Sequence, residues 1–415
     1  MSECGCSSIA TPGSLKPIEE ARDLMLSHAK VVDGVERVAI ADALGRVLAE
    51  PLSSQVDVPP WDNSAMDGYA VNSVDLTTAN IKLPISQRIP AGVSGTELQP
   101  GTAARIFTGA PVPPGADTVV IQEVCRQEGN AVVITELPSA GANVRKAGED
   151  TSVGQEILQP GTKLGPQHLG LAASVGIAEI PVYRRLKVAL FSSGDELVMP
   201  GGTLGPGQIF NSNQFTLAGL LESLNCEVIN LGMVEDTFDA TCGALAAGAV
   251  QADLVLASGG VSVGEEDHVK PAVERLGSLD LWKIAIRPGK PVAFGHISDT
   301  PFIGAPGNPV SLFVTFCVFA RPFILKSQGV TSDLLPTPIQ APATFEWTKP
   351  DKRREFARAR LDLDAQGQAA VSIFASRSSG VLSSVAWANG LAVIPEGQVL
   401  AKGDMVEFLP FSELI

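Results

Sequence analysis

The sequence is poor in residues that build zinc sites or disulfide frameworks. Its 415 residues include 6 cysteines without Cys-x-x-Cys spacing and 4 histidines without a His-Glu-x-x-His pattern. These absences argue against a zinc ribbon, a disulfide scaffold and a zinc hydrolase. Cys4 and Cys6 lie in a Ser/Gly-rich tail, which we expect to be a disordered end rather than a metal or redox site.

Basic residues are also scarce. The chain has 30 Lys and Arg against 45 Asp and Glu, a net charge of −15. Nucleic acids and anionic membranes attract basic surfaces, so neither is an expected partner. If the substrate is an anion, a bridging cation or a local basic pocket must overcome the repulsion of the whole molecule.

Long hydrophobic runs are absent. The longest, residues 313–325, is interrupted by Arg321 and Pro322 and is too short to span a bilayer. Residues 1–16 lack the basic start and apolar centre of a secretory signal. We therefore expect a cytoplasmic protein.

Changes in hydrophobic periodicity and residue type along the chain predict a multidomain α/β plus β fold. Apolar residues at helical spacing in 17–30 and 166–175 flank a segment of short β-branched runs, so a β-rich module is expected to be inserted into a discontinuous domain. The expected parts are a discontinuous helical domain (7–53 and 155–185), an inserted β-rich module (54–154), an α/β domain (186–334) and a C-terminal β domain (335–415).

The α/β domain gives the clearest pattern. Expected strands alternate with expected helices, which predicts a mostly parallel sheet covered on both faces. The strands are expected at 187–191, 227–231, 254–257, 292–294 and 301–303, and the helices at 213–224, 237–250, 269–276 and 309–325.

Glycine-containing loops follow three of these strands, at 192–197, 258–267 and 304–309. The carboxyl ends of parallel strands share one edge of a sheet, and glycines let backbone N–H groups approach an anion. The loops therefore predict one phosphate-binding crevice. Its candidate contacts are Ser258, Gly259, Gly260, Pro306, Asn308 and Pro309.

Charged residues in and near these loops predict a metal-bridged anion. Carboxylates beside a polyanion require a divalent cation, and Mg²⁺ is the expected ion, with Glu196, Asp236 and Asp267 as ligands. For the neighbouring Glu265 and Glu266, capping of the next helix is an equally simple role. Lys283 and Arg287 alternate onto one face of an expected strand and supply positive charge, although a solvated edge strand would show the same pattern.

Residues 59–71, PPWDNSAMDGYAV, form a built loop. Prolines restrict its backbone, Gly68 permits a conformation closed to residues with a β-carbon, and Asp62 and Asp67 carry ionisable groups. Together with RIFTGAPVPPGAD, FSSGDELV, NSNQ, VLASGGVSVGEEDHVK, RPGKPVAFG and GAPGNPVSLFVTF, the motif resembles the molybdopterin molybdotransferase family over nearly the whole chain. Asn211 stands where that family often has Asp, which removes a possible ligand or helix cap.

The resemblance implies an enzyme that inserts molybdate into adenylylated molybdopterin and releases AMP with the help of Mg²⁺. It implies an α/β molybdopterin-binding domain, a C-terminal β-barrel-like domain and a homodimer whose cleft is shared between subunits. A molybdopterin adenylyltransferase and molybdoenzyme apoproteins are possible partners. The residues that match family positions are Asp67, Thr108 and Asp267 as catalytic residues, Glu196, Lys283, Arg287 and Lys290 as substrate contacts, and Arg353, Arg358 and Ser379 near the molybdate.

Three other functions share parts of this pattern. A molybdopterin adenylyltransferase or a competence-damage-type nucleotide hydrolase would have the α/β domain but would leave the DNSAMDGYA module unexplained. A gephyrin-like scaffold protein would need an extra domain and a long linker. The transferase is therefore preferred.

Overall fold

The computed structural model describes residues 15–260, 268–289, 291–363 and 367–415. Its α/β part is built on a six-stranded sheet of order β16-β13-β17-β21-β20-β18. Strands β16, β13, β17 and β21 are parallel, whereas β20 and β18 join antiparallel at one side. The strands are β13 (Lys187–Ser193), β16 (Glu227–Val234), β17 (Leu254–Ser258), β18 (Gly277–Lys283), β20 (Pro291–Ile297) and β21 (Thr300–Ala305).

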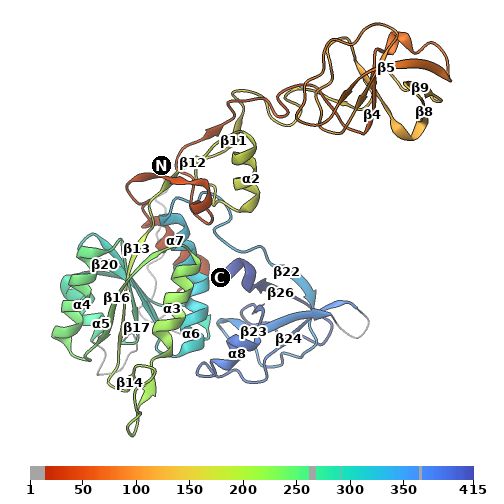
Figure 1. Ribbon diagram of the computed structural model, residues 1–415. Helices are drawn as coiled ribbons and strands as arrows, with labels where there is room; N and C mark the ends of the chain where they lie inside the picture. Colours follow the sequence, from red (N-terminus) through yellow and green to blue (C-terminus); the bar gives the residue numbers. More distant parts are fainter. Residues whose placement is uncertain (1–14, 261–267, 290, 364–366) are drawn as a thin grey trace, which may run out of the picture.

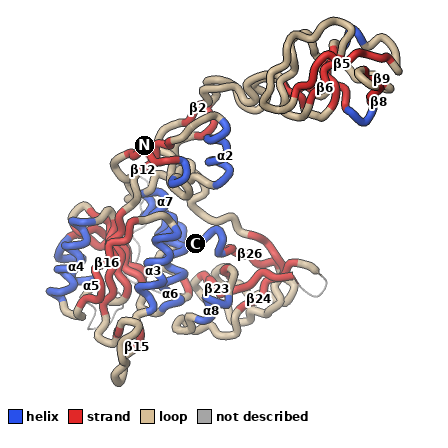
Figure 2. Tube along the Cα trace, in the orientation of Figure 1, coloured by secondary structure: helices blue, strands red, loops and turns tan. Residues whose placement is uncertain are grey.

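Helices cover both faces of this sheet, with α4 and α5 on one side and α3 and α6 on the other (Figure 2). They are α3 (Ser212–Ser223), α4 (Phe238–Gln251), α5 (Val269–Leu276) and α6 (Pro309–Thr315), which continues through η4 (Phe316–Ala320) into α7 (Arg321–Ser327). The segment Pro309–Ser327 is apolar and long enough to cross a membrane, which corrects the shorter run expected from the sequence. Because 94% of its apolar window is buried inside the protein, it is accounted for as a core helix.

A small unit is formed by two separated stretches of the chain. Strand β1 (Val35–Ala39) pairs with β12 (Glu179–Tyr183), and β2 (Leu52–Ser53) pairs with β11 (Glu156–Leu158). The unit also contains η1 (Ile40–Asp42) and α2 (Pro166–Ser174). Its core includes Leu48, Leu164 and Ile180, all nearly or fully buried.

Helix α1 (Ile18–Ser27) packs against the α/β part instead. Its buried residues Ile18, Ala21 and Met25 lie on one helical face and join the core that contains Phe323 of α7. An amphipathic helix is predicted correctly here, but its periodicity does not specify which neighbour covers the apolar face.

The β-rich module stands at the far end of an elongated molecule (Figure 1). Its six-stranded sheet has the order β7-β4-β6-β5-β9-β8, and β10 pairs with β3. The elements are β3 (Asn63–Ser64), β4 (Gly68–Val71), η2 (Ser73–Asp75), β5 (Ile81–Ile89), β6 (Ala103–Ile106), β7 (Thr118–Ile121), η3 (Gln122–Val124), β8 (Cys125–Glu128), β9 (Ala131–Ile134) and β10 (Val144–Arg145).

The C-terminal sheet has the order β19-β23-β25-β26-β22, and β24 pairs with β23. Its elements are β19 (Ile286–Arg287), β22 (Ile339–Pro342), β23 (Arg354–Leu363), β24 (Ala369–Ile373), α8 (Ser383–Trp387), β25 (Gly390–Ile394), β26 (Met405–Pro410) and α9 (Phe411–Leu414). Because β19 comes from the α/β part, it connects that part to this sheet. The expectation that Lys283 and Arg287 share one strand is wrong, since they belong to β18 and β19 in different sheets.

Candidate functional site

A cavity of about 840 Å³ lies at the carboxyl ends of β13, β17 and β21. The structure brings together there most of the loop residues that the sequence singles out. The predicted residues that line it are Glu196, Asp236, Ser258, Gly259, Gly260, Pro306, Asn308, Pro309 and Ser379. A short strand pair, β14 (Leu197–Val198) with β15 (Ile209–Phe210), supplies further lining through Leu197, Ile209 and Phe210.

Close contact between the loops explains the glycine after β17. Gly259 has a φ of +90°, and a Cβ there would lie 2.4 Å from the backbone oxygen of Ser193. A side chain would therefore strain the backbone and push the loops after β13 and β17 apart. Glycine at this position keeps both loops at the edge of one cavity.

Two helices begin at the cavity, α3 beside Asn211 and α6 beside Asn308. The Asn211 side chain accepts a hydrogen bond from the backbone N–H of Gln214 at 3.2 Å. Asn211 therefore caps α3, even though the family often has Asp at this position. Helix N-termini present N–H groups and partial positive charge, which favour a bound anion.

Asn213 is a cavity residue that the sequence prediction missed as a contact, although it lies in the NSNQ motif. Its Nδ2 donates to the backbone oxygen of Gly307 at 2.7 Å, which joins the start of α3 to the loop after β21. Its Oδ1 is buried and accepts no hydrogen bond from the described residues. That oxygen is available to a donor group on a ligand.

The charge of the cavity is negative. Among its described lining residues, the ionisable ones are Glu196 and Asp236, and neither Lys nor Arg is present. Ser193 Oγ donates to Asp236 Oδ1 at 3.2 Å, which orients that carboxylate. The third predicted metal ligand, Asp267, and the predicted contact Lys290 lie outside the described residues. A polyanion in this cavity would need a cation beside the carboxylates.

The predicted contact Arg287 is engaged by acidic residues of the C-terminal part. Its guanidinium lies 2.6 Å from Asp351 Oδ2 and 3.3 Å from Glu355 Oε2. Hydrogen bonds from Arg353 and Arg287 outweigh burial and hold the pKa of Asp351 well below its usual range. The predicted contact Lys283 is exposed at the end of β18. Neither cation lines the cavity.

Arg358 lies beneath the loop that brings Ser379 to the cavity. It is only 2% exposed and donates to Ser384 Oγ at 3.0 Å, Ser376 O at 2.6 Å and Ser378 O at 3.3 Å. The backbone of Ser379 is also fastened from the other side, because its carbonyl accepts from the N–H of Val310 at 3.0 Å. Arg358 thus holds the loop, while Arg353 is bonded to Asp351.

Asp67 and Thr108 meet on the distant β module. Asp67 Oδ1 accepts from Thr108 N at 2.8 Å and from Thr108 Oγ1 at 2.9 Å. These bonds hold the pKa of Asp67 below its usual range, so the carboxylate is ionised at neutral pH. Within one chain the module and the cavity lie at separate places in the elongated molecule (Figure 1), so the pair does not join the cavity residues.

The same loop distinguishes its two aspartates. Asp62 is bonded to Lys146 Nζ at 2.7 Å and to Ala147 N at 2.9 Å, so it braces the loop. The position of Gly68 is closed to residues with a β-carbon, as expected, although its φ is not positive. Glycine is required there because a Cβ would lie 2.0 Å from the oxygen of Val120 in the paired strand.

A crevice outside the carboxyl ends of parallel strands is the binding place of nucleotide- and anion-binding α/β proteins. Comparison with models of protein families shows to which of these proteins the chain is related. The MoeA N-terminal region (domain I and II) matches residues 16–176, the probable molybdopterin binding domain matches 189–326, and the MoeA C-terminal region (domain IV) matches 340–411. The chain belongs to the MoeA family.

Relatives and solved structures agree with that assignment. The molybdopterin molybdenumtransferase of Haemophilus influenzae is 41% identical over 402 residues, covering 96% of this chain and 99% of the relative. That of Nostoc sp. is 37% identical over 406 residues, covering 94% and 93%. The MoeA protein of Pyrococcus horikoshii superposes with a TM-score of 0.82 at 28% identity, covering 95% of this chain and all of that one. The predicted fold class and family resemblance are confirmed.

Proposed function

We propose that this chain is a molybdopterin molybdotransferase, which uses molybdate and adenylylated molybdopterin to form molybdenum cofactor and release AMP. The observation that carries the proposal is the cavity of about 840 Å³, where glycine loops and helix starts adjoin Glu196 and Asp236. It is large enough for a nucleotide-sized ligand. Relatives at 37–41% identity over nearly the full length are named molybdopterin molybdenumtransferases, which supports the same activity.

The residues fit a role for Mg²⁺. Oxygen ligands suit this hard cation, and Glu196 and Asp236 supply carboxylates where the substrate pyrophosphate would lie. Bound Mg²⁺ would neutralise charge on the phosphates as AMP leaves. Asn213 Oδ1 would accept a hydrogen bond from the ligand, and Asp236 is oriented by Ser193. Asp267 would complete the set of carboxylates.

A two-fold dimer would bring the two halves of the site together. Asp67 carries a localised negative charge on a module remote from its own cavity, and Trp61 and Met66 beside it are 50% and 46% exposed. In a homodimer, that module could reach the cavity of the other subunit, and symmetry would create two equal sites. The adenylyltransferase that makes the substrate and the apoenzymes that receive the product would then be partners in the cytoplasm.

The test is to incubate the chain with adenylylated molybdopterin and molybdate while AMP is followed. AMP should appear only when Mg²⁺ is present, and EDTA should stop the reaction until excess Mg²⁺ is added. Full turnover after exhaustive chelation would contradict the metal role. Absence of molybdate-dependent AMP release under all metal conditions would contradict the proposed function itself.

A further inference from the structure

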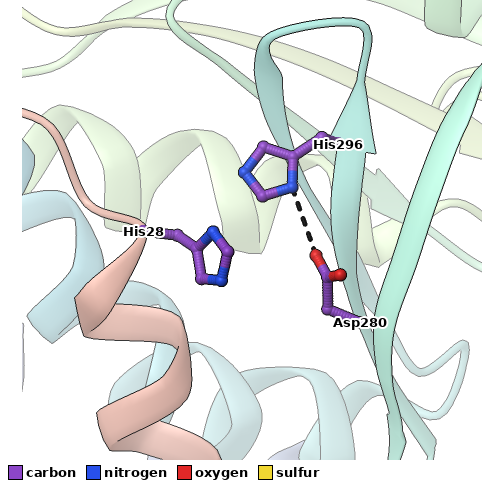
Figure 3. A group of neighbouring side chains, drawn as sticks. All are labelled: His28, Asp280 and His296. Atoms are coloured by element: carbon purple, nitrogen blue, oxygen red, sulfur yellow. Dashed lines mark hydrogen bonds and ion pairs between the residues drawn. The ribbon is translucent and has the colours of Figure 1, made fainter.

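Two histidines and an aspartate meet where helix α1 ends against the edge of the α/β sheet (Figure 3). His28 is the C-terminal cap of α1, Asp280 lies on β18, and His296 lies on the neighbouring strand β20. Each offers one ligand atom, and these atoms all lie within 4.8 Å of one another. Within the described residues, this is the one group of at least three His, Cys, Asp or Glu side chains with that property.

The two imidazoles are held in place by packing. Their ring centroids are 4.9 Å apart, and each lies 5.6 Å from the ring of Phe294, which is fully buried. Asp280 Oδ2 lies 3.2 Å from His296 Nδ1, and these side chains are only 28% and 19% exposed. The three polar groups are therefore gathered before any ligand binds.

A cavity adjoins the two histidines of the cluster, although Asp280 does not line it. This second cavity, of about 630 Å³, is lined by His28 and His296 and shares no lining residue with the cavity at the strand ends. Five acidic or basic neighbours also line it, namely Lys30, Asp33, Arg184, Asp253 and Asp299. Arg184 and Asp253 pair with each other at 2.7 Å, so Arg184 is not an isolated cation facing an arriving metal.

We propose that His28, Asp280 and His296 form a binding site for Zn²⁺ or a similar nitrogen-preferring divalent ion. Two imidazole nitrogens and one carboxylate oxygen match the ligand preference of zinc, and a water would take the remaining position. Zinc ligand distances near 2.1 Å in a tetrahedral site place neighbouring ligand atoms roughly 3.4 Å apart, so modest side-chain rotations would close the site. Mg²⁺ prefers oxygen ligands and should not compete.

The bound ion would fasten α1 to the sheet edge. His28 is distant in sequence from Asp280 and His296, so one ion would link elements that are far apart in the chain and pack together in the fold. Binding to the folded chain only would raise its thermal stability. This inference is independent of the proposed transferase activity, because neither the cavity nor the ligands are shared.

Competition with a chromophoric zinc chelator tests the site in the full chain. A Cys4→Ser/Cys6→Ser background removes the thiols that lie outside the described residues. We expect one zinc ion per chain, with affinity reduced roughly tenfold or more by His28→Gln, Asp280→Asn or His296→Gln. His168→Gln is the matched control, because His168 Nδ1 accepts from Gly165 N at 2.9 Å in the cap of α2.

Thermal unfolding gives a second readout. Zn²⁺ should raise the Tm of the background chain and of the His168 variant more than that of the cluster variants. Any rise in Tm caused by Mg²⁺ should be the same in the background chain and in the cluster variants, because Mg²⁺ is not expected at this site. Asp280→Asn keeps the size of the side chain and so covers the case in which a histidine variant fails to fold. If the folded Asp280 variant binds zinc as tightly as the background, or if binding disappears with the two cysteines, the proposal is overturned.

Discussion

Replacing Arg358 with Met should loosen the loop that carries Ser379. Methionine fills much of the arginine volume but donates no hydrogen bonds to Ser376 O, Ser378 O or Ser384 Oγ. Ser378 is exposed, so water can replace one donor. Ser384 is fully buried, and its Oγ keeps the bond that it donates to Val381 O but loses the Arg358 donor. A buried acceptor left without its donor costs about 1–3 kcal/mol, so the free energy of unfolding should fall by about that amount.

The functional consequence separates two roles for this arginine. If Arg358 positions the loop, Arg358→Lys should lose most molybdate-dependent AMP release despite keeping the charge, because an ammonium cannot reproduce the fork of the guanidinium. If Arg358 binds the oxyanion directly as a charge, the Lys variant should keep much of the activity and respond mainly in KM for molybdate.

Urea unfolding followed by circular dichroism measures the stability, and AMP release measures the function. Arg360→Met is the matched control: Arg360 lies on the same strand β23, its side chain is 39% exposed, and its ion-pair partner is Asp362. Arg360 also donates to Trp387 O at 3.2 Å, but no fully buried side chain depends on it. Exposed pairs contribute little, so this variant should lose less stability and less turnover than Arg358→Met. Equal losses in the two variants would refute the reasoning from burial and loop anchoring.

Three further predictions concern carboxylates. Asp67→Asn and Asp267→Asn should each abolish molybdate-dependent AMP release while circular dichroism shows retained folding; near-normal turnover in both would remove them from the site. Mixing these two inactive variants, each with a different tag, should restore activity in about half of the clefts of each heterodimer, because one of its two clefts then carries neither substitution. If verified heterodimers are inactive, the site lies within one chain. Burial raises the pKa of Asp253, but hydrogen bonds from Arg184 and Lys187 N–H outweigh it and leave the pKa lowered. The stability that this carboxylate contributes is therefore present above pH of about 4 and is lost as the pH falls further. Asp253→Asn should lower the free energy of unfolding at neutral pH and make it depend less on pH in the acid range. If urea unfolding between pH 7 and 3 is the same for the variant and the parent, the predicted direction of this effect is wrong.

The α/β sheet could be predicted because its information is local. The strand cores around Leu190 and Leu256 are continuous apolar runs, and the intervening helices have their own periodicity. Strand β18 was missed because the apolar and polar residues of 277–283 alternate with charged Asp280 and Lys283 among them, which is typical of a half-exposed edge. Its pairing with β20 depends on contacts that a local pattern does not specify.

The roles of several site residues could not be predicted from the sequence, because they depend on partners that are far away in the chain. Asp62 and Asp67 stand in one motif with the same side chain, yet Lys146 binds the first and Thr108 the second. Arg287 was assigned by charge and alternation, and its acidic partners come from the C-terminal part of the chain. The His28 cluster likewise has no sequence signature, because its members are joined only by the packing of α1 on the sheet.

The distribution of charge indicates that the proposed cation is needed for binding of the anionic substrate as well as for the reaction. Arg287, Arg353 and Arg358 were expected to attract the anionic substrates, but each is bonded to carboxylates or backbone within the protein. The described lining of the cavity offers an anion only N–H groups, helix starts and polar side chains, against two carboxylates and a net charge of −15 on the chain. In such a field the anion and a divalent cation would bind most favourably together. Mg²⁺ should therefore lower the Kd for adenylylated molybdopterin as well as speed AMP release, and it should do so less when Asp236 is changed to Asn.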